Sequence, residues 1–177
     1  MTFEKALRGL MVLEGGFTVD DGGPTEVGIT QSAWDGWCKK IGQPSSPIES
    51  LSQEDIQTFY RNAYWTPLLC AQLPDGVDFC LFQWAINHEY FGGDGPAVKD
   101  LQICCGASPD GCMGPATAGT ACGMDRMKLM ECLLGRQEAW YQNDARVNAD
   151  APLVGWENRI ERTRKFVGLP DNKGGTT

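Results

Sequence analysis

Apolar side chains recur every three or four residues along most of the chain, which predicts helices separated by short polar turns. The first helix begins near Phe3 and ends before the glycine pair Gly15–Gly16, because glycine breaks helices. Later helices are expected around residues 33–41, 56–63, 77–85, 97–105, 125–144 and 156–167, with another starting at Pro115. Capping signals support two starts, at Thr30 and at the Ser52–Asp55 box.

One stretch departs from the helical pattern. The segment FTVDDGGPTEVGIT, residues 17–30, is rich in glycine and β-branched residues. It suits two short strands joined by a tight turn at Asp21–Gly22–Gly23. The predicted fold class is therefore α+β, mostly helical, with a small N-terminal β-wing on a helical body.

The charge balance narrows the choice of partner. The 177 residues carry 15 Lys and Arg against 23 Asp and Glu, a net charge of −8, which disfavours nucleic acid. The N-terminus lacks the basic region and apolar run of a secretory signal, so we expect synthesis in a cytoplasm. A basic run, WENRIERTRKF, places Arg159, Arg162 and Lys165 at helical spacing, and we interpret it as a solvated helix face rather than an anion-binding one.

Eight cysteines are many for this length, and five of them fall between Cys104 and Cys132. Their spacing, CC-x6-C-x9-C, lacks the paired C-x2-C units of zinc sites, so no metal site is predicted. Cytoplasmic synthesis disfavours disulfides, and we expect mainly buried thiols. Neighbours such as Cys105 and Cys112 are expected to pair only under oxidising conditions.

The predicted β element carries the polar residues of most chemical interest. Glu14 lies at the end of the first helix, and Asp20, Asp21 and Thr25 follow it. Cleavage of a glycosidic bond needs one protonated carboxyl for the leaving oxygen and one ionised carboxylate that steers water or attacks. From the residues alone, the alternative is a set of solvated turn formers.

Three stretches resemble one known family. The segment EGGFTVDDGGPTEVGIT resembles the EGG…D-x-GG-x-T-x-x-GIT signature of glycoside hydrolase family 108, the N-acetylmuramidases of phage endolysins and related lysis proteins. Residues 50–88, with YRNAYW, LPDG and QWAINH, are similar to the family's next block. The segment AVKDLQICCGASPDGCMGPATAGT resembles a part of the family that is often classified as peptidoglycan-binding.

The resemblance implies a lysozyme-like fold and specific catalytic roles. The glutamate of EGG is the family's catalytic acid, which is Glu14 here. The second carboxylate falls on Asp21 or Asp20, and the threonine of the catalytic group on Thr25 or Thr30, with Asp21 and Thr25 preferred.

Substrate contacts are also expected from Thr30, Asn87 and Tyr64, although packing is the alternative role for the last two. No metal or organic cofactor is implied. The predicted organisation is a catalytic lobe at 1–75, a helical lobe at 76–170 continuous with it, and a flexible tail at 171–177.

The function expected from this resemblance is hydrolysis of the β-1,4 bond between N-acetylmuramic acid and N-acetylglucosamine, with inversion. The partner is the glycan strand of peptidoglycan, with neither nucleic acid nor integral membrane association, and the chain is expected to be a monomer. It would be made in a host cytoplasm and reach the wall after the membrane is permeabilised. The alternative is a wall-binding protein that has kept the fold without turnover.

Overall fold

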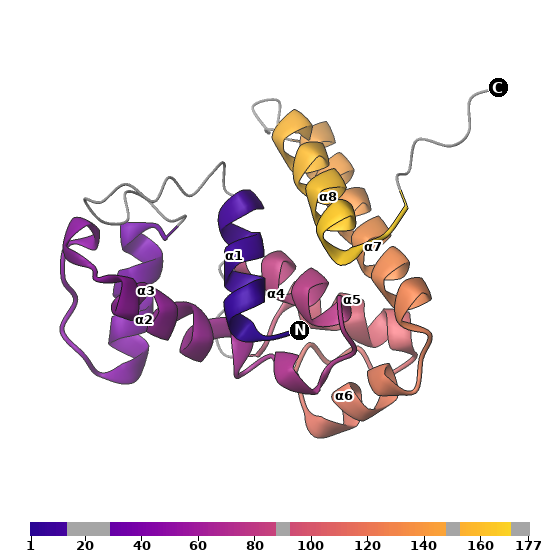
Figure 1. The fold of residues 1–177 in the computed structure, drawn as a ribbon, viewed down its shortest axis with the longest axis horizontal. Helices are drawn as coiled ribbons and strands as arrows, with labels where there is room; N and C mark the ends of the chain where they lie inside the picture. Colours follow the sequence, from indigo (N-terminus) through magenta and orange to yellow (C-terminus); the bar gives the residue numbers. More distant parts are fainter. Residues whose placement is uncertain (14–28, 88–92, 148–152, 171–177) are drawn as a thin grey trace.

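The structure, a computed structural model, describes four parts of the chain: residues 1–13, 29–87, 93–147 and 153–170 (Figure 1). These parts are helical, and no strand occurs within them; an isolated bridge joins Asp94 and Cys112. The prediction of a mostly helical protein is confirmed. The predicted β-wing falls almost wholly on residues 14–28, outside the described residues, and stays a prediction.

The helices of these four parts follow the predicted order. They are α1 (Phe3–Leu13), α2 (Gln31–Ile41), α3 (Gln53–Tyr60), α4 (Val77–Asn87), α5 (Pro96–Cys105), α6 (Pro115–Cys122), α7 (Arg126–Val147) and α8 (Leu153–Val167), with the short turns η1 (Ile48–Ser50), η2 (Arg61–Trp65) and η3 (Cys70–Gln72). Figure 1 shows α2 and α3 at one end of the molecule and the α7–α8 pair on the other side, with α1 between them.

The predicted helix starts are confirmed. The Thr30 hydroxyl accepts a hydrogen bond from the Ala33 N–H at 3.1 Å, so Thr30 caps α2. Ser52 and Asp55 form a complete capping box at the start of α3. Pro115 occupies the first turn of α6, where its missing N–H costs nothing.

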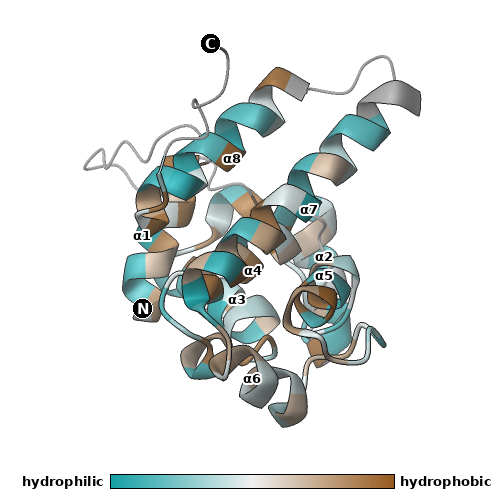
Figure 2. Cartoon of the chain, turned by 90° about the vertical axis from the view of Figure 1, so that its right-hand side faces the viewer, coloured by the Kyte–Doolittle hydropathy of each residue, from teal (hydrophilic) through white to brown (hydrophobic). Residues whose placement is uncertain are grey.

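Helix α4 forms the centre of the molecule. Ten of its eleven residues are buried, and it packs against α5, α7, α8 and the turns η2 and η3. A helix that is apolar on all sides is stable only when neighbours cover it on all sides. The longest helix, α7, is largely hydrophilic on the face seen in Figure 2. Among the described helices, none has the length and apolar character that crossing a membrane requires.

Helix α1 lies against α8 at a close crossing. A Cβ atom at Gly9 would stand 2.5 Å from Cζ of Phe166, so only glycine lets the two helices approach this far. The Phe166 ring in turn packs on Phe79 of α4, with ring centroids 4.4 Å apart. The three helices are therefore locked together around one aromatic side chain.

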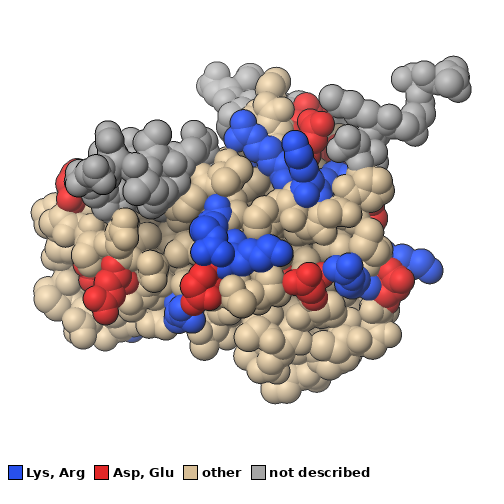
Figure 3. Space-filling view, in the orientation of Figure 1, with Lys and Arg blue, Asp and Glu red and all other residues tan. Residues whose placement is uncertain are grey.

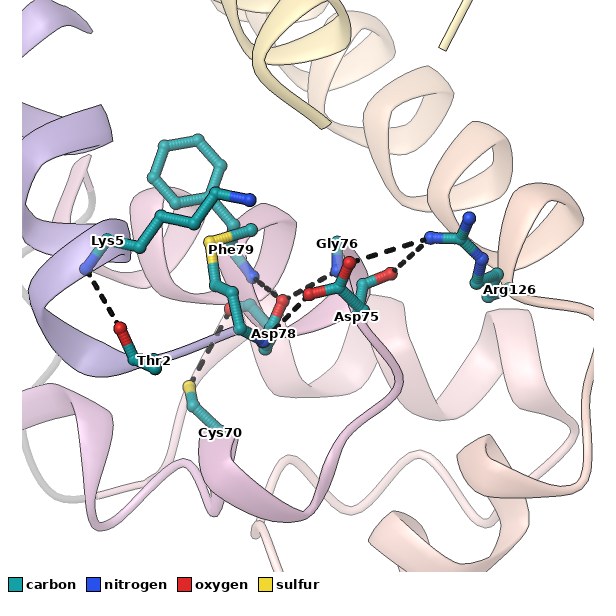
Figure 4. Close-up of polar contacts among 9 residues, drawn as sticks. Thr2, Lys5, Cys70, Asp75, Gly76, Asp78, Phe79 and Arg126 are labelled. Atoms are coloured by element: carbon teal, nitrogen blue, oxygen red, sulfur yellow. Dashed lines mark hydrogen bonds and ion pairs between the residues drawn. The ribbon is translucent and has the colours of Figure 1, made fainter. Parts of the chain in front are cut away.

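A buried carboxylate ties the start of the chain to α4, as part of the contacts drawn in Figure 4. Asp78 Oδ1 accepts hydrogen bonds from the N–H groups of Gly76 and Phe79, both at 2.8 Å, and Oδ2 pairs with the Met1 ammonium. Burial raises the pKa of Asp78 in spite of these bonds. Burial also lowers the pKa of the ammonium, but its bonds to Asp78 and Asp75 outweigh that effect and raise the pKa.

The expectation for the cysteines was wrong in two respects. Cys104 on α5 and Cys132 on α7 form a disulfide across 28 residues of sequence. Cys105 is a buried thiol as expected, whereas Cys112 and Cys122 are exposed thiols. Spacing along the chain could not reveal the pair, because it depends on how α5 packs against α7. In the described part of the chain, no cluster of metal-ligating side chains is found.

Candidate active site

The residues predicted for catalysis lie outside the described residues, so their roles stay predictions: Glu14, Asp20, Asp21 and Thr25. The structure does place the two ends of that segment. Leu13, the last residue of α1, and Ile29 are 7% and 9% exposed and belong to the same hydrophobic core. Glu14 therefore follows directly on a buried helix end, whose position the α8 crossing fixes.

Thr30 is exposed at the other end of this segment. Its side-chain oxygen accepts the Ala33 N–H, so its structural role as the cap of α2 is established. Its role as a substrate contact stays a prediction.

Asn87 lies half-buried at the end of α4, and its amide is oriented by a neighbour on α7. The Tyr141 hydroxyl donates a hydrogen bond to Asn87 Oδ1 at 2.7 Å. Tyr141 itself is 1% exposed. The carbonyl end of the amide therefore faces the protein interior.

A series of hydrogen-bonded, buried polar side chains determines the direction of the hydrogen bond between Tyr141 and Asn87. Arg159 Nε can only donate, so the Gln83 Oε1 atom 3.0 Å away must accept. Gln83 Nε2 then donates to Gln137 Oε1 at 2.7 Å. Gln137 Nε2 donates to the Tyr141 oxygen at 2.7 Å, which leaves the Tyr141 proton for Asn87. The fixed donor character of one guanidinium thus sets the direction of every link.

The series ends at the amide nitrogen of Asn87. With Oδ1 engaged by Tyr141, Asn87 presents Nδ2 on its other side, and no described residue accepts a hydrogen bond from that nitrogen. An amide N–H pair held in this way is suited to a ligand carbonyl or hydroxyl oxygen.

An aromatic surface adjoins this series of hydrogen-bonded side chains. The Tyr141 ring stacks on Trp156 with centroids 4.7 Å apart, and Trp140 packs edge-on against Trp84 at 5.7 Å. Trp140 is 38% exposed, and Trp156 is partly exposed. Flat, partly exposed rings beside a hydrogen-bond donor combine an apolar face with polar recognition.

Sequence reasoning did not identify the hydrogen-bonded residues that lead to Asn87, which are Gln83, Gln137, Tyr141 and Arg159. Gln83 has a visible signal, because it interrupts the apolar run FCLFQWAI of a helix that is otherwise core. Arg159 corrects the expectation that the basic run is a solvated face, since it is 7% exposed and points into the core. Arg162 and Lys165 are exposed as expected.

Tyr64 is placed in the core rather than on a surface. It is 2% exposed and packs edge-on against Phe59, with centroids 5.9 Å apart, and against Tyr60. This is the packing role that the sequence left open as the alternative to a sugar contact, and we do not include Tyr64 in the proposed site.

The segment SPDGCMGPAT forms a turn around one buried amide. Gln102 is 1% exposed, and its Nε2 donates to Asp110 Oδ1 at 2.7 Å and to the Cys112 carbonyl at 3.1 Å. Its Oε1 accepts the Gly111 N–H at 2.8 Å. Gly111 has φ of 80°, which favours glycine. These residues therefore have a structural role in the turn, as turn chemistry predicts.

Comparison with known proteins identifies the family. Residues 7–88 match the family model described as Glycosyl hydrolase 108. This part of the chain belongs to the glycosyl hydrolase 108 family. The family resemblance predicted from the EGG and GGPTEVGIT motifs is thereby confirmed, and the match supports a glycoside hydrolase.

The glycosyl hydrolase 108 match runs from within α1 to the end of α4, and it includes the segment with Glu14 and the helix that ends at Asn87. A solved structure of Brucella abortus SagA is similar over 98% of both chains, with a TM-score of 0.72 and 26% sequence identity. No curated protein matches the chain.

Proposed function

We propose that the chain is a peptidoglycan hydrolase that cleaves the β-1,4 bond between N-acetylmuramic acid and N-acetylglucosamine. The observation that carries this proposal is the family match over residues 7–88, which includes the EGG glutamate, Glu14, the residue that follows α1 in sequence. In the same proposal the segment 17–30 forms the β-wing of a lysozyme-like fold, and the substrate lies between this wing and the helical body.

Glu14 is the proposed general acid. It donates its proton to the glycosidic oxygen as the bond to the anomeric carbon breaks. A general acid must hold its proton until the bond breaks, and partial burial of a carboxyl favours that protonated form. Leu13, the residue directly before Glu14, is buried in the core.

Asp21, or Asp20, is the proposed general base, with Thr25 as its partner in holding the attacking water. The base takes one proton from the water while the oxygen attacks the face of the sugar opposite to the leaving group. The reaction therefore inverts the anomeric centre, and the two carboxyl groups are expected to stand ~6.5–9.5 Å apart.

Asn87 and Thr30 are the proposed substrate contacts among the described residues. Asn87 Nδ2 donates to an acetamido carbonyl of the glycan, because its oxygen is already engaged by Tyr141. Trp140 and Trp156 offer sugar-stacking faces beside it. The chain acts as a monomer, is made in a host cytoplasm, and reaches the wall after membrane permeabilisation.

Analysis of the products tests this proposal. Purified peptidoglycan digested with the protein should release muropeptides with a reducing muramic acid end, and fresh product should show the inverted anomer by NMR. Anhydro-muramic ends would show a transglycosylase instead, and new amino groups would show an amidase or peptidase. Wall binding without any released fragment would favour the binding-protein alternative.

A further inference from the structure

The basic run near the C-terminus forms part of a cationic surface that the proposed reaction does not use. Figure 3 shows two groups of Lys and Arg on one face of the molecule, one over α1 and one over α8. The exposed cations of these helices are Lys5 and Arg8 on α1 and Arg162 and Lys165 on α8. We call these four residues the cationic strip.

The packing of α1 on α8 brings the two halves of the strip together. Gly9 and Phe166 touch at the crossing, and each is the direct neighbour in sequence of a strip residue, Arg8 and Lys165. One turn further, Arg162 Nη1 donates to the Val12 carbonyl at 3.5 Å. The strip therefore reaches the end of α1, two residues before Glu14.

The strip keeps a net positive charge among its neighbours. Glu4, on the same helix as Arg8, is neutralised by its ion pair with Arg61 at 2.9 Å. Glu157 and Glu161 on α8 are exposed, and Asp75 interacts with Lys5, so these three carboxylates offset part of the charge, but the four cations still outnumber them. The molecule as a whole carries a net charge of −8, so its overall charge repels anions. The cationic strip is a local exception to that overall charge.

We infer that the cationic strip binds the carboxylates of the peptide stems that branch from the glycan strand. This inference rests on the proposed function, because it takes the glycan to be bound beside Glu14. Stem peptides leave the muramic acid units of that glycan and carry free carboxylates, so a strand at the end of α1 brings them within reach of Arg162 and then of the other strip residues. Lysine and arginine are the side chains that pair with such carboxylates.

A double variant, Arg162→Gln with Lys165→Gln, tests the inference. Its matched control, Lys39→Gln with Lys128→Gln, removes the same charge from exposed positions outside the strip. On stem-bearing peptidoglycan we expect the strip variant to raise KM by about fivefold, as two exposed ion pairs would. We expect kcat to stay unchanged and the effect to disappear in 0.5 M salt, which screens exposed charges. On glycan strands stripped of stems by an amidase, the variant should equal the parent.

Several outcomes would overturn the inference. An unchanged KM on stem-bearing walls, an equal loss on stripped strands, or the same loss in the control pair would each do so. Binding of the parent to anionic lipid vesicles as tightly as to walls, lost in the strip variant, would assign the strip to a membrane instead. If the parent cleaves neither substrate, the proposed function fails, and co-sedimentation with the same two substrates still decides whether the strip binds stems.

Discussion

The Tyr141 hydroxyl is the last link of the hydrogen-bonded series that starts at Arg159, because it joins Gln137 to Asn87. Tyr141→Phe keeps the ring that stacks on Trp156 but leaves Gln137 and Asn87 without this partner. We expect the free energy of unfolding to fall by about 1–2 kcal/mol, the usual cost of unpairing buried polar groups. We also expect KM for peptidoglycan to rise several-fold, because the Asn87 amide is no longer held. Urea unfolding and steady-state kinetics measure the two effects.

Thr163→Val is the matched control for this variant. It removes a fully buried hydroxyl that donates to the Arg159 carbonyl at 2.8 Å and that has no place in the chain leading to Asn87. It should lower stability to a similar extent while leaving KM unchanged. If Tyr141→Phe behaves in the same way, the chain stabilises the core and does not position Asn87.

Two helices, α5 and α7, are joined by the Cys104–Cys132 disulfide, which closes a long loop of chain. Constraining a loop of this length stabilises the folded state by about 3 kcal/mol, chiefly through the unfolded state. We therefore expect the oxidised protein to melt several degrees above the reduced protein. Alkylation of denatured, unreduced protein should label six cysteines, and labelling of all eight should need reductant.

The double variant Cys104→Ala with Cys132→Ala serves as the control for the disulfide. Its melting temperature should not respond to reductant, because the remaining thiols are unpaired. Labelling of eight cysteines in protein purified under air, without reductant, would show that the pair does not form.

Over the whole molecule, features set by neighbours in sequence were predictable and those set by distant neighbours were not. The Thr30 cap and the Ser52–Asp55 box depend on residues three positions apart, so the sequence alone located them. The Arg159–Gln83 hydrogen bond joins residues 76 positions apart, and the Gln83–Gln137 bond joins residues 54 apart. Whether a polar side chain on α8 faces water or the core is decided by the packing of α4, α7 and α8.

The same distinction applies to the candidate site. The glutamate and the glycine-rich segment after it could be recognised because they form one continuous motif, and the family match confirmed that recognition. The orientation of the Asn87 amide could not be predicted, because it depends on a series of hydrogen bonds between side chains of α4, α7 and α8. The burial of Tyr64 in the aromatic cluster depends on tertiary packing, so spacing along the sequence could not predict it.

The most direct measurement compares Glu14→Gln with Glu26→Gln in the release of reducing ends from purified peptidoglycan. Glu14→Gln keeps the size of the side chain and removes the transferable proton, so turnover should fall by at least ~10²–10⁴-fold, the usual contribution of a general acid. Co-sedimentation with walls should persist in this variant. Glu26→Gln makes the same chemical change twelve positions along the chain and should stay within severalfold of the parent. Parent-like turnover in Glu14→Gln together with a dead Glu26→Gln would contradict the assignment of the acid.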